Sequence, residues 1–375
     1  MDKRRSVTST DIAHAAGVSR ATVSVVLNGT RGNIRVSDET RQRVLTAAAA
    51  LNYSPHPAAQ ALRRQRSSEI AFVPRTMHKT EFGHPIAYQL NLHASRAAAR
   101  RGYRVIEVNP EINATGDGDE LFAFLLSRRP DGVMFDSPTT ADDVRRIMES
   151  GIAVVQLMRP QLAVETATIT VDASRGIIDA IDHLVGLGHR RIAYLGSDDA
   201  HIANRSRREC FLATLARHGI PIPADYIALG PEYTLEQGAA LTQRVLGCSP
   251  PPTALFAAAD NFAVGALHAL HAARIRVPDA MSVVSYDDVY AAMLYPPITS
   301  VSQPLREIAE CAIECITGQL ERAAGAATEP VHLVLPTHLT VRQSTQLPRD
   351  ETGEGAAESE RGRMMVSIAA SGGER

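Results

Sequence analysis

The alternation of short apolar runs with amphipathic stretches from residue 68 onward restricts the possible folds more than any other feature of this chain. The runs, each typical of a buried strand, are EIAFVP, YRVIEV, DGVMFD, IAVVQL, TITVD, RIAYLG, TALFAA and MSVVSYDD. Strands that alternate with helical patterns predict repeated βαβ units with parallel sheets. The length suffices for two doubly wound units, whose ligands would bind outside the carboxyl ends of the strands.

The body carries none of the motifs that would make it an enzyme or a nucleotide-binding protein. It contains no GxGxxG fingerprint, no P-loop and no GxSxG elbow. Its four cysteines form no CxxC pair and have no histidine at zinc-finger spacing. We therefore expect no cofactor, no metal site and no disulfide framework.

Charge divides the chain into a small basic head and a large acidic body. Of its 375 residues, the first 66 hold 11 basic and 4 acidic side chains, a formal charge of +7, and the remaining 309 carry −9. This asymmetry is typical of a protein whose head meets a polyanion. The first residues contain no apolar signal region, and no run of 18 apolar residues occurs. The sequence thus favours a cytoplasmic protein that neither leaves the cell nor spans a membrane.

The head has the pattern of three short helices. Residues 7–28 show two amphipathic segments separated at Gly17, with Thr8 and Ser19 placed to cap them. A third helix is predicted at about residues 37–51, with Ser37 as its N-cap. This order, in which two helices joined by a tight turn precede a third helix, predicts a helix-turn-helix domain.

In a helix-turn-helix domain the second helix enters the major groove, and its first outward side chains reach the base edges. Here these side chains belong to Arg20, Ala21 and Val25. Arg20 can donate two hydrogen bonds to a guanine, whereas the other two offer only apolar contacts. The alternative is a plain three-helix bundle with solvated arginines, and the charge of the head argues against it.

The segments DIAHAAGVSRATVSVVLN and VSDETRQRVLTAAAALNYSPHPAAQAL resemble the DNA-binding head and hinge of the lactose-repressor (LacI/GalR) family. The resemblance places Arg20, Ala21 and Val25 at base-reading positions. It places three polar residues against the DNA backbone: Ser19, Thr22 and Asn28. The loop NGTRGNIRVS is about three residues longer than the family's usual connection, and its Arg31 and Arg35 either add phosphate contacts or are solvated.

The segment PAAQALRRQR, from Pro57 to Arg66, is basic, alanine-rich and too short to be a stable helix alone. The resemblance assigns it as a hinge helix that pairs with its dimer mate in the minor groove. Its wedge residue would be Leu62, and an apolar wedge with flanking cations is what unstacking a base step requires. The expected minor-groove residues are Ala61, Leu62, Arg63 and Arg64. The alternative reading of Leu62 is an ordinary linker residue.

The resemblance extends through the body to about residue 345 and implies two α/β subdomains like those of periplasmic binding proteins. The expected organisation is a head at 1–56, a hinge at 57–67, a body at 68–345 and a disordered tail at 346–375. The expected subdomains are about 68–165 with 300–328, and about 166–299 with 329–345. The chain would then cross between them near residues 165, 300 and 329. A helix at about 304–323 presents an apolar stripe expected to be a core or dimer face.

The family binds a small effector between the subdomains, and the resemblance implies four contacts in this chain: Arg207, Asp287, Tyr233 and Gln303. An arginine fork, a carboxylate acceptor and an aromatic face suit an oxygen-rich ring. Three other cleft positions depart from the sugar-responsive pattern: Met158, Ala259 and His84. Fewer hydroxyl-binding groups predict a sugar-like or other small metabolite rather than a simple hexose.

These features together predict a transcriptional regulator, expected to be a repressor, that binds a pseudo-palindromic double-stranded operator as a homodimer. The tail has no leucine heptad, so the sequence gives no support for a tetramer. One alternative is a solute-binding receptor with the same body and no regulatory role, which the basic head argues against. Another is an enzyme fused to a DNA-targeting head, which would need a nucleophile and base or a cofactor loop.

Overall fold

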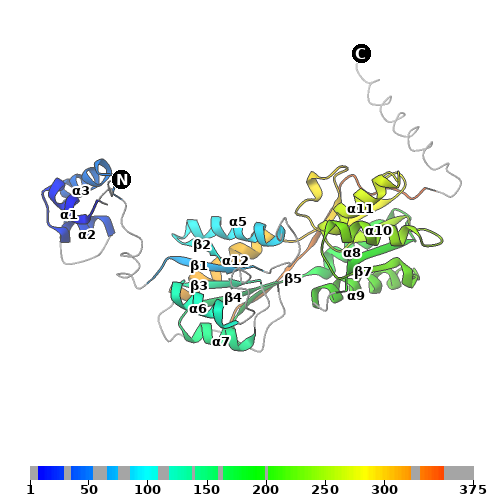
Figure 1. The fold of residues 1–375 in the computed structure, drawn as a ribbon, viewed down its shortest axis with the longest axis horizontal. Helices are drawn as coiled ribbons and strands as arrows, with labels where there is room; N and C mark the ends of the chain where they lie inside the picture. Colours follow the sequence, from blue (N-terminus) through cyan, green and yellow to red (C-terminus); the bar gives the residue numbers. More distant parts are fainter. Residues whose placement is uncertain are drawn as a thin grey trace, which may run out of the picture.

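The computed structural model describes residues 7–28, 35–53, 66–74, 85–108, 118–136, 140–158, 164–198, 202–321 and 330–349. Its first part is a bundle of three helices, α1 (Ser9–Ala16), α2 (Arg20–Asn28) and α3 (Asp38–Ala50) (Figure 1). The Thr8 hydroxyl accepts from the Asp11 backbone, and Gly17 ends α1 with a φ of 63°. Ile12, Val23 and Val44 are buried where the three helices meet. The predicted helix-turn-helix is confirmed.

The first sheet of the body has six strands in the order β11-β5-β4-β3-β1-β2, and all neighbouring strands are parallel. The strands are β1 (Glu69–Val73), β2 (Arg104–Glu107), β3 (Gly132–Phe135), β4 (Ala153–Leu157), β5 (Ala167–Asp172) and β11 (His332–Pro336). The helices are α5 (Pro85–Arg100), α6 (Gly118–Arg128), α7 (Ala141–Glu149) and α12 (Leu305–Glu321). We call this sheet and these helices the first subdomain.

The second sheet also has six strands, in the order β12-β10-β9-β8-β6-β7, with β12 antiparallel to β10. The strands are β6 (Ile192–Ser197), β7 (Ile227–Gly230), β8 (Ala254–Ala257), β9 (Ser282–Asp287), β10 (Thr299–Ser302) and β12 (His338–Thr340). The helices are α8 (Ala173–Gly186), α9 (Ile202–Arg217), α10 (Leu235–Leu246) and α11 (Asp260–Ala272), with 3-10 turns η2 (Ala224–Tyr226) and η3 (Ala291–Met293). We call this part the second subdomain.

The chain passes three times between the two sheets. It crosses after β5 at Asp172, after β10 at Gln303 and at Thr337, which separates β11 from β12. These points lie a few residues later than the expected 165, 300 and 329. The reason is that β5 stays paired with β4 up to Leu157 and Ile169 and continues beside β11, while β10 is still a strand of the second sheet. All three crossings leave the carboxyl ends of parallel strands.

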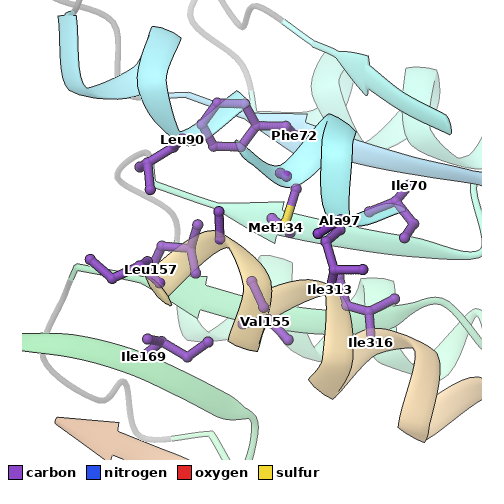
Figure 2. Packing of buried hydrophobic residues seen from close by; sticks show 14 of the residues in the cluster. Ile70, Phe72, Leu90, Ala97, Met134, Val155, Leu157, Ile169, Ile313 and Ile316 are labelled. Carbon is purple, nitrogen blue, oxygen red and sulfur yellow. The ribbon is translucent and has the colours of Figure 1, made fainter. Parts of the chain in front are cut away.

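Helix α12 returns from the second subdomain and packs in the core of the first. Figure 2 shows its Ile313 and Ile316 facing Val155 of the sheet and Ala97 of α5. Its whole apolar stripe is buried, namely Leu305, Ile308, Ala309, Ala312, Ile313 and Ile316. A Cβ at Gly132 would lie 2.4 Å from the Ile316 side chain, so glycine allows the helix to approach β3 closely. The stripe is therefore core.

Candidate DNA-reading helix and effector site

Helix α2 presents its first residues to solvent while its rear face is buried. The Ser19 hydroxyl accepts from the Thr22 backbone N–H at 3.1 Å and lies 2.9 Å from the Thr22 hydroxyl, which fixes the start of the helix. Arg20 and Ala21 are exposed on the first turn, and Val25 is half-buried. The predicted base-reading side chains thus start from an open helix N-terminus, as insertion into a groove requires.

The other predicted DNA contacts are described only in part. Arg35 is exposed just before α3. Asn28 is the last residue of α2, and its side chain lies outside the described residues. Outside them also lie Arg31, the hinge positions Ala61, Leu62, Arg63 and Arg64, and the cleft position His84.

The predicted effector arginine is half-buried beside an aromatic ring. Arg207, on α9, has its guanidinium carbon 3.9 Å from the centroid of the Tyr286 ring, and its Nη1 donates to the carbonyl of Ala258 at 3.0 Å. Its Nε is buried with no hydrogen-bond partner among the described residues. Burial is the largest single influence and lowers the pKa of Arg207, but Tyr286, Asp287 and the neighbouring tyrosines together raise the pKa above the ordinary value. The site therefore holds a permanent cation with a free donor.

Asp287 and Gln303 meet at the carboxyl ends of the neighbouring strands β9 and β10. Gln303 Nε2 donates to Asp287 Oδ1 at 2.7 Å, while Gln303 Oε1 is buried without a partner among the described residues. Burial raises the pKa of Asp287 to about 7, against the opposing effect of Arg207. The backbone of Asp287 has a φ of 108°, a conformation that favours glycine and is found at functional sites. The two predicted side chains thus form one contact.

Tyr233 comes from the loop before α10 and is fixed from three directions. Its hydroxyl donates to Asn204 Oδ1, its carbonyl accepts from Asn261 Nδ2 at 2.7 Å, and its ring stacks on Phe262 with centroids 5.2 Å apart. Asn204 precedes Arg207 by one helical turn on α9, and its Nδ2 is buried without a partner among the described residues. Asn204 thereby connects the predicted aromatic residue Tyr233 to the helix that carries Arg207, although the sequence did not point to Asn204.

Of the three substituted cleft positions, the two that the structure describes lie in different subdomains. Met158 follows β4 with a φ of 55° and packs against the core of the first subdomain. Ala259 is 5% exposed and is the N-cap of α11, where its methyl group provides no side-chain cap. The apolar character expected at both positions is therefore present, one on each side of the crossings.

Three further residues shape the site. Tyr286 supplies the ring beneath Arg207, and Asn204 holds the Tyr233 hydroxyl. Asp260 accepts from the backbone N–H groups of Val289 and Tyr290 at 2.7 and 2.8 Å, and burial raises its pKa. It thus anchors the loop that follows Asp287. The continuous strand-like run MSVVSYDD could have indicated the buried Tyr286, whereas no signal in the sequence pointed to Asn204.

Within the described ranges, His, Cys, Asp and Glu side chains form no group of three or more that could hold a metal ion. Nor does this part of the chain contain a helix with the length and apolar character needed to cross a bilayer.

Comparison with known proteins identifies the family to which this fold belongs. Residues 8–56 match the family described as "Bacterial regulatory proteins, lacI family", and residues 181–345 match "Periplasmic binding protein-like domain". The HTH-type transcriptional regulator CelR of Thermobifida fusca is 33% identical over 92% of this chain and 100% of its own. A solved transcriptional regulator CelR-cellobiose complex is 30% identical, covers 90% of this chain and 99% of its own, and has a TM-score of 0.64. The lac repressor dimer bound to operator and the anti-inducer ONPF is 26% identical, covers 91% and 100%, and has a TM-score of 0.72. The chain therefore belongs to the lacI family of bacterial transcriptional regulators.

Proposed function

We propose that this regulator is a cytoplasmic repressor that binds a pseudo-palindromic operator as a homodimer and releases or holds it according to a small molecule between its subdomains. The observation that carries the DNA-binding part is the exposed first turn of α2, where Arg20 and Ala21 stand free while the opposite face packs on α1 and α3. Arg20 donates to a guanine, and Ala21 and Val25 contact thymine methyl groups. Arg31, Arg35 and the hinge residues add phosphate and minor-groove contacts.

The effector part rests on buried polar atoms that have no partner among the described residues. Arg207 Nε and Asn204 Nδ2 are donors, and Gln303 Oε1 is an acceptor. A buried polar group without a hydrogen bond costs about 1–3 kcal/mol, so a ligand that satisfies these atoms gains binding free energy. Hydroxyl groups both donate and accept, and the Tyr233 ring offers an apolar face. A sugar-like metabolite fits this set, and the CelR relative is solved with cellobiose.

The homodimer contact is proposed to include the surface around η3. Met293 is 75% exposed and Tyr295 is 95% exposed, so two large apolar side chains stand in solvent two residues apart. Exposed aromatic and methionine side chains are enriched at protein interfaces. A dimer that buries them would place two heads on the two halves of an inverted repeat.

Regulation follows from the three crossings. The proposed effector contacts Arg207 and Asp287 in the second subdomain and further residues in the first. It thereby changes the relative stability of two arrangements of the subdomains. Its influence equals its difference in affinity for the two arrangements. We propose that the protein acts by binding, because among the described residues the groups gathered at Arg207 include no nucleophile–base pair.

Selection of DNA from a random duplex pool by the purified full-length protein at near-physiological salt tests the proposal. An enriched inverted repeat is the expected result, and retention without sequence preference would refute it. Arg20→Ala should weaken operator binding by about 1–3 kcal/mol and relax preference at one base pair of each half-site. The matched control is Arg41→Ala, which removes the same charge from an exposed position on α3.

The effector site is tested with Arg207→Ala. This variant should keep operator affinity and lose its response to any sugar that shifts the wild-type protein. Arg205→Ala is the matched control, because Arg205 lies on the same helix but is exposed beside Glu209. A wild-type dose response in Arg207→Ala would overturn the assignment of the site.

A further inference from the structure

A carboxylate at the start of β3 holds the backbone at the point where the linker from the head joins the body. Asp131 Oδ1 accepts from the Ser67 backbone N–H at 2.8 Å, and Asp131 Oδ2 accepts from the Ser68 backbone N–H at 2.8 Å. Asp131 is 9% exposed, so these charge-assisted hydrogen bonds are largely shielded from water.

Asp131 is itself fixed by the first sheet. Its backbone N–H donates to the backbone carbonyl of Glu69 on β1 at 2.8 Å, and its own carbonyl accepts from the backbone N–H of Ala153 on β4 at 3.1 Å. The backbone of Asp131 is therefore held in place by the sheet. Its carboxylate in turn holds the backbone of Ser67 and Ser68 in a fixed position relative to the sheet.

Two further contacts complete the attachment. The Arg66 guanidinium donates to the carbonyl of Leu320 near the end of α12, and the Ser68 carbonyl accepts from the Arg104 backbone at 3.0 Å. Ser68 has a φ of 57°, a left-handed conformation that costs free energy in any residue with a Cβ. Such a conformation persists only where its surroundings fix it. The chain thus turns sharply at Ser68, and all of these contacts belong to the first subdomain.

We propose that Asp131 is a positioning residue for operator binding, which sets the direction in which the linker leaves the first subdomain. In a dimer, two such directions determine the separation of the two reading helices, and this separation must match the spacing of the operator half-sites. Movement of the first subdomain then moves the attachment point of the linker at Ser67 and Ser68 with it. This inference rests on the proposed function as a dimeric operator-binding protein.

The test measures how affinity depends on half-site spacing. The inverted repeat selected by the wild-type protein is rebuilt with its centre shortened or lengthened by one and two base pairs, and binding is measured for the full-length protein. The wild-type protein should lose at least about tenfold in affinity for each altered spacing, since every shift also rotates one half-site about the DNA axis. Asp131→Ala should bind all spacings within about threefold of one another, with unchanged affinity for random DNA.

Asp143→Ala is the matched control. The Asp143 carboxylate also accepts from a backbone N–H in the first subdomain, that of Thr140 at 3.2 Å, but its partner caps α7, away from the linker. It should retain the wild-type spacing profile. Asp131→Asn keeps the side-chain volume and one acceptor oxygen, so it should fold and show an intermediate profile.

A merely structural role would lower the melting temperature of Asp131→Ala and leave the spacing profile intact. A wild-type profile in both Asp131 variants would overturn the inference. If Asp131→Ala fails to fold, the profile of Asp131→Asn decides. If the wild-type protein selects no inverted repeat, the proposed function is refuted. This outcome differs from failure of the inference on Asp131, in which the wild-type protein selects a repeat but the Asp131 variants keep its spacing profile.

Discussion

Acidification should weaken this protein through one buried imidazole. His189 is 1% exposed, its Nε2 donates to the carbonyl of Gln346 at 2.9 Å, and its Nδ1 lies 2.8 Å from the Thr253 hydroxyl. Burial lowers the pKa of His189 from 6.5 to about 4. Between these values the unfolded chain binds a proton that the folded chain does not. The stabilisation is therefore complete above pH 6.5 and is lost as the pH falls toward 4.

The size of the effect follows from the two pKa values of His189. A pKa difference of one unit corresponds to about 1.4 kcal/mol, so the whole shift is worth about 3 kcal/mol of unfolding free energy. About 2 kcal/mol of this is lost between pH 7 and pH 5. Burial raises the pKa of Asp287 to about 7, which has the opposite effect over the same range. The wild-type protein alone would thus hide the contribution of His189.

The measurement is urea unfolding of the wild-type protein and of His189→Gln at pH 7 and at pH 5. The loss of unfolding free energy of the variant is subtracted from that of the wild-type protein. The contributions of Asp287 and of every other titratable group that both proteins share then cancel. The wild-type protein should lose about 2 kcal/mol more than the variant. His268→Gln, which changes an exposed histidine of α11, should behave as the wild-type protein does. Equal losses in the wild-type protein and His189→Gln would show that His189 is not buried in neutral form.

Three other substitutions probe the core and the head. Gln156→Leu should raise the unfolding free energy by about 1–3 kcal/mol, because both amide atoms of this 1% exposed residue lack a partner among the described residues; a loss in urea unfolding would reveal a partner. Ile316→Ala should cost about 2–5 kcal/mol by leaving a cavity between α12 and β3, and a loss below 1 kcal/mol would contradict the packing in Figure 2. Thr8→Ala should destabilise the head by about 1 kcal/mol through loss of the α1 cap, measured by hydrogen exchange of its backbone amides, and unchanged exchange would count against the cap.

The parts of the fold that the sequence predicted are those where local chemistry and tertiary packing agree. Thr8, Gly17 and Ser37 cap or end helices in the head as their side chains and conformations suggest. The strands that read as continuous apolar runs are buried on both faces of parallel sheets, which is why they carry no alternation.

Some strands fall outside the predicted apolar runs: β7 (IALG) and β11 (HLVLP) are short but apolar, whereas β10 and β12 lack an apolar signature. Strand β10 has the sequence TSVS, yet Ser300 is fully buried, with its hydroxyl 3.2 Å from that of Ser285 on β9. A polar strand of this kind is stabilised by partners distant in sequence, which no local pattern reveals. The resemblance placed the crossings near residues 165, 300 and 329, and in the structure they follow Asp172, Ser302 and Pro336, where β5, β10 and β11 end.

The residues of the candidate site were expected from the family resemblance, which compares one position at a time. Arg207, Asp287 and Gln303 were expected, and the structure brings them to one region. Asn204 was missed because its importance comes from the Tyr233 hydroxyl, which approaches from another element. A network of hydrogen bonds across elements is a property of the fold and leaves no trace in residue spacing.

The order of the last two strands has a consequence for biosynthesis. Strand β11 is the edge of the first sheet, β12 is the edge of the second, and only Thr337 separates them. While the ribosome is still adding these residues, β5 and β10 each present an unpaired edge, and such edges promote aggregation. The helices of the head, by contrast, need only local contacts and can form early. A nascent chain therefore has a DNA-binding unit before it has a complete regulatory body. A single proteolytic cut just before residue 330 would break the covalent link to the closing strands of both sheets at once.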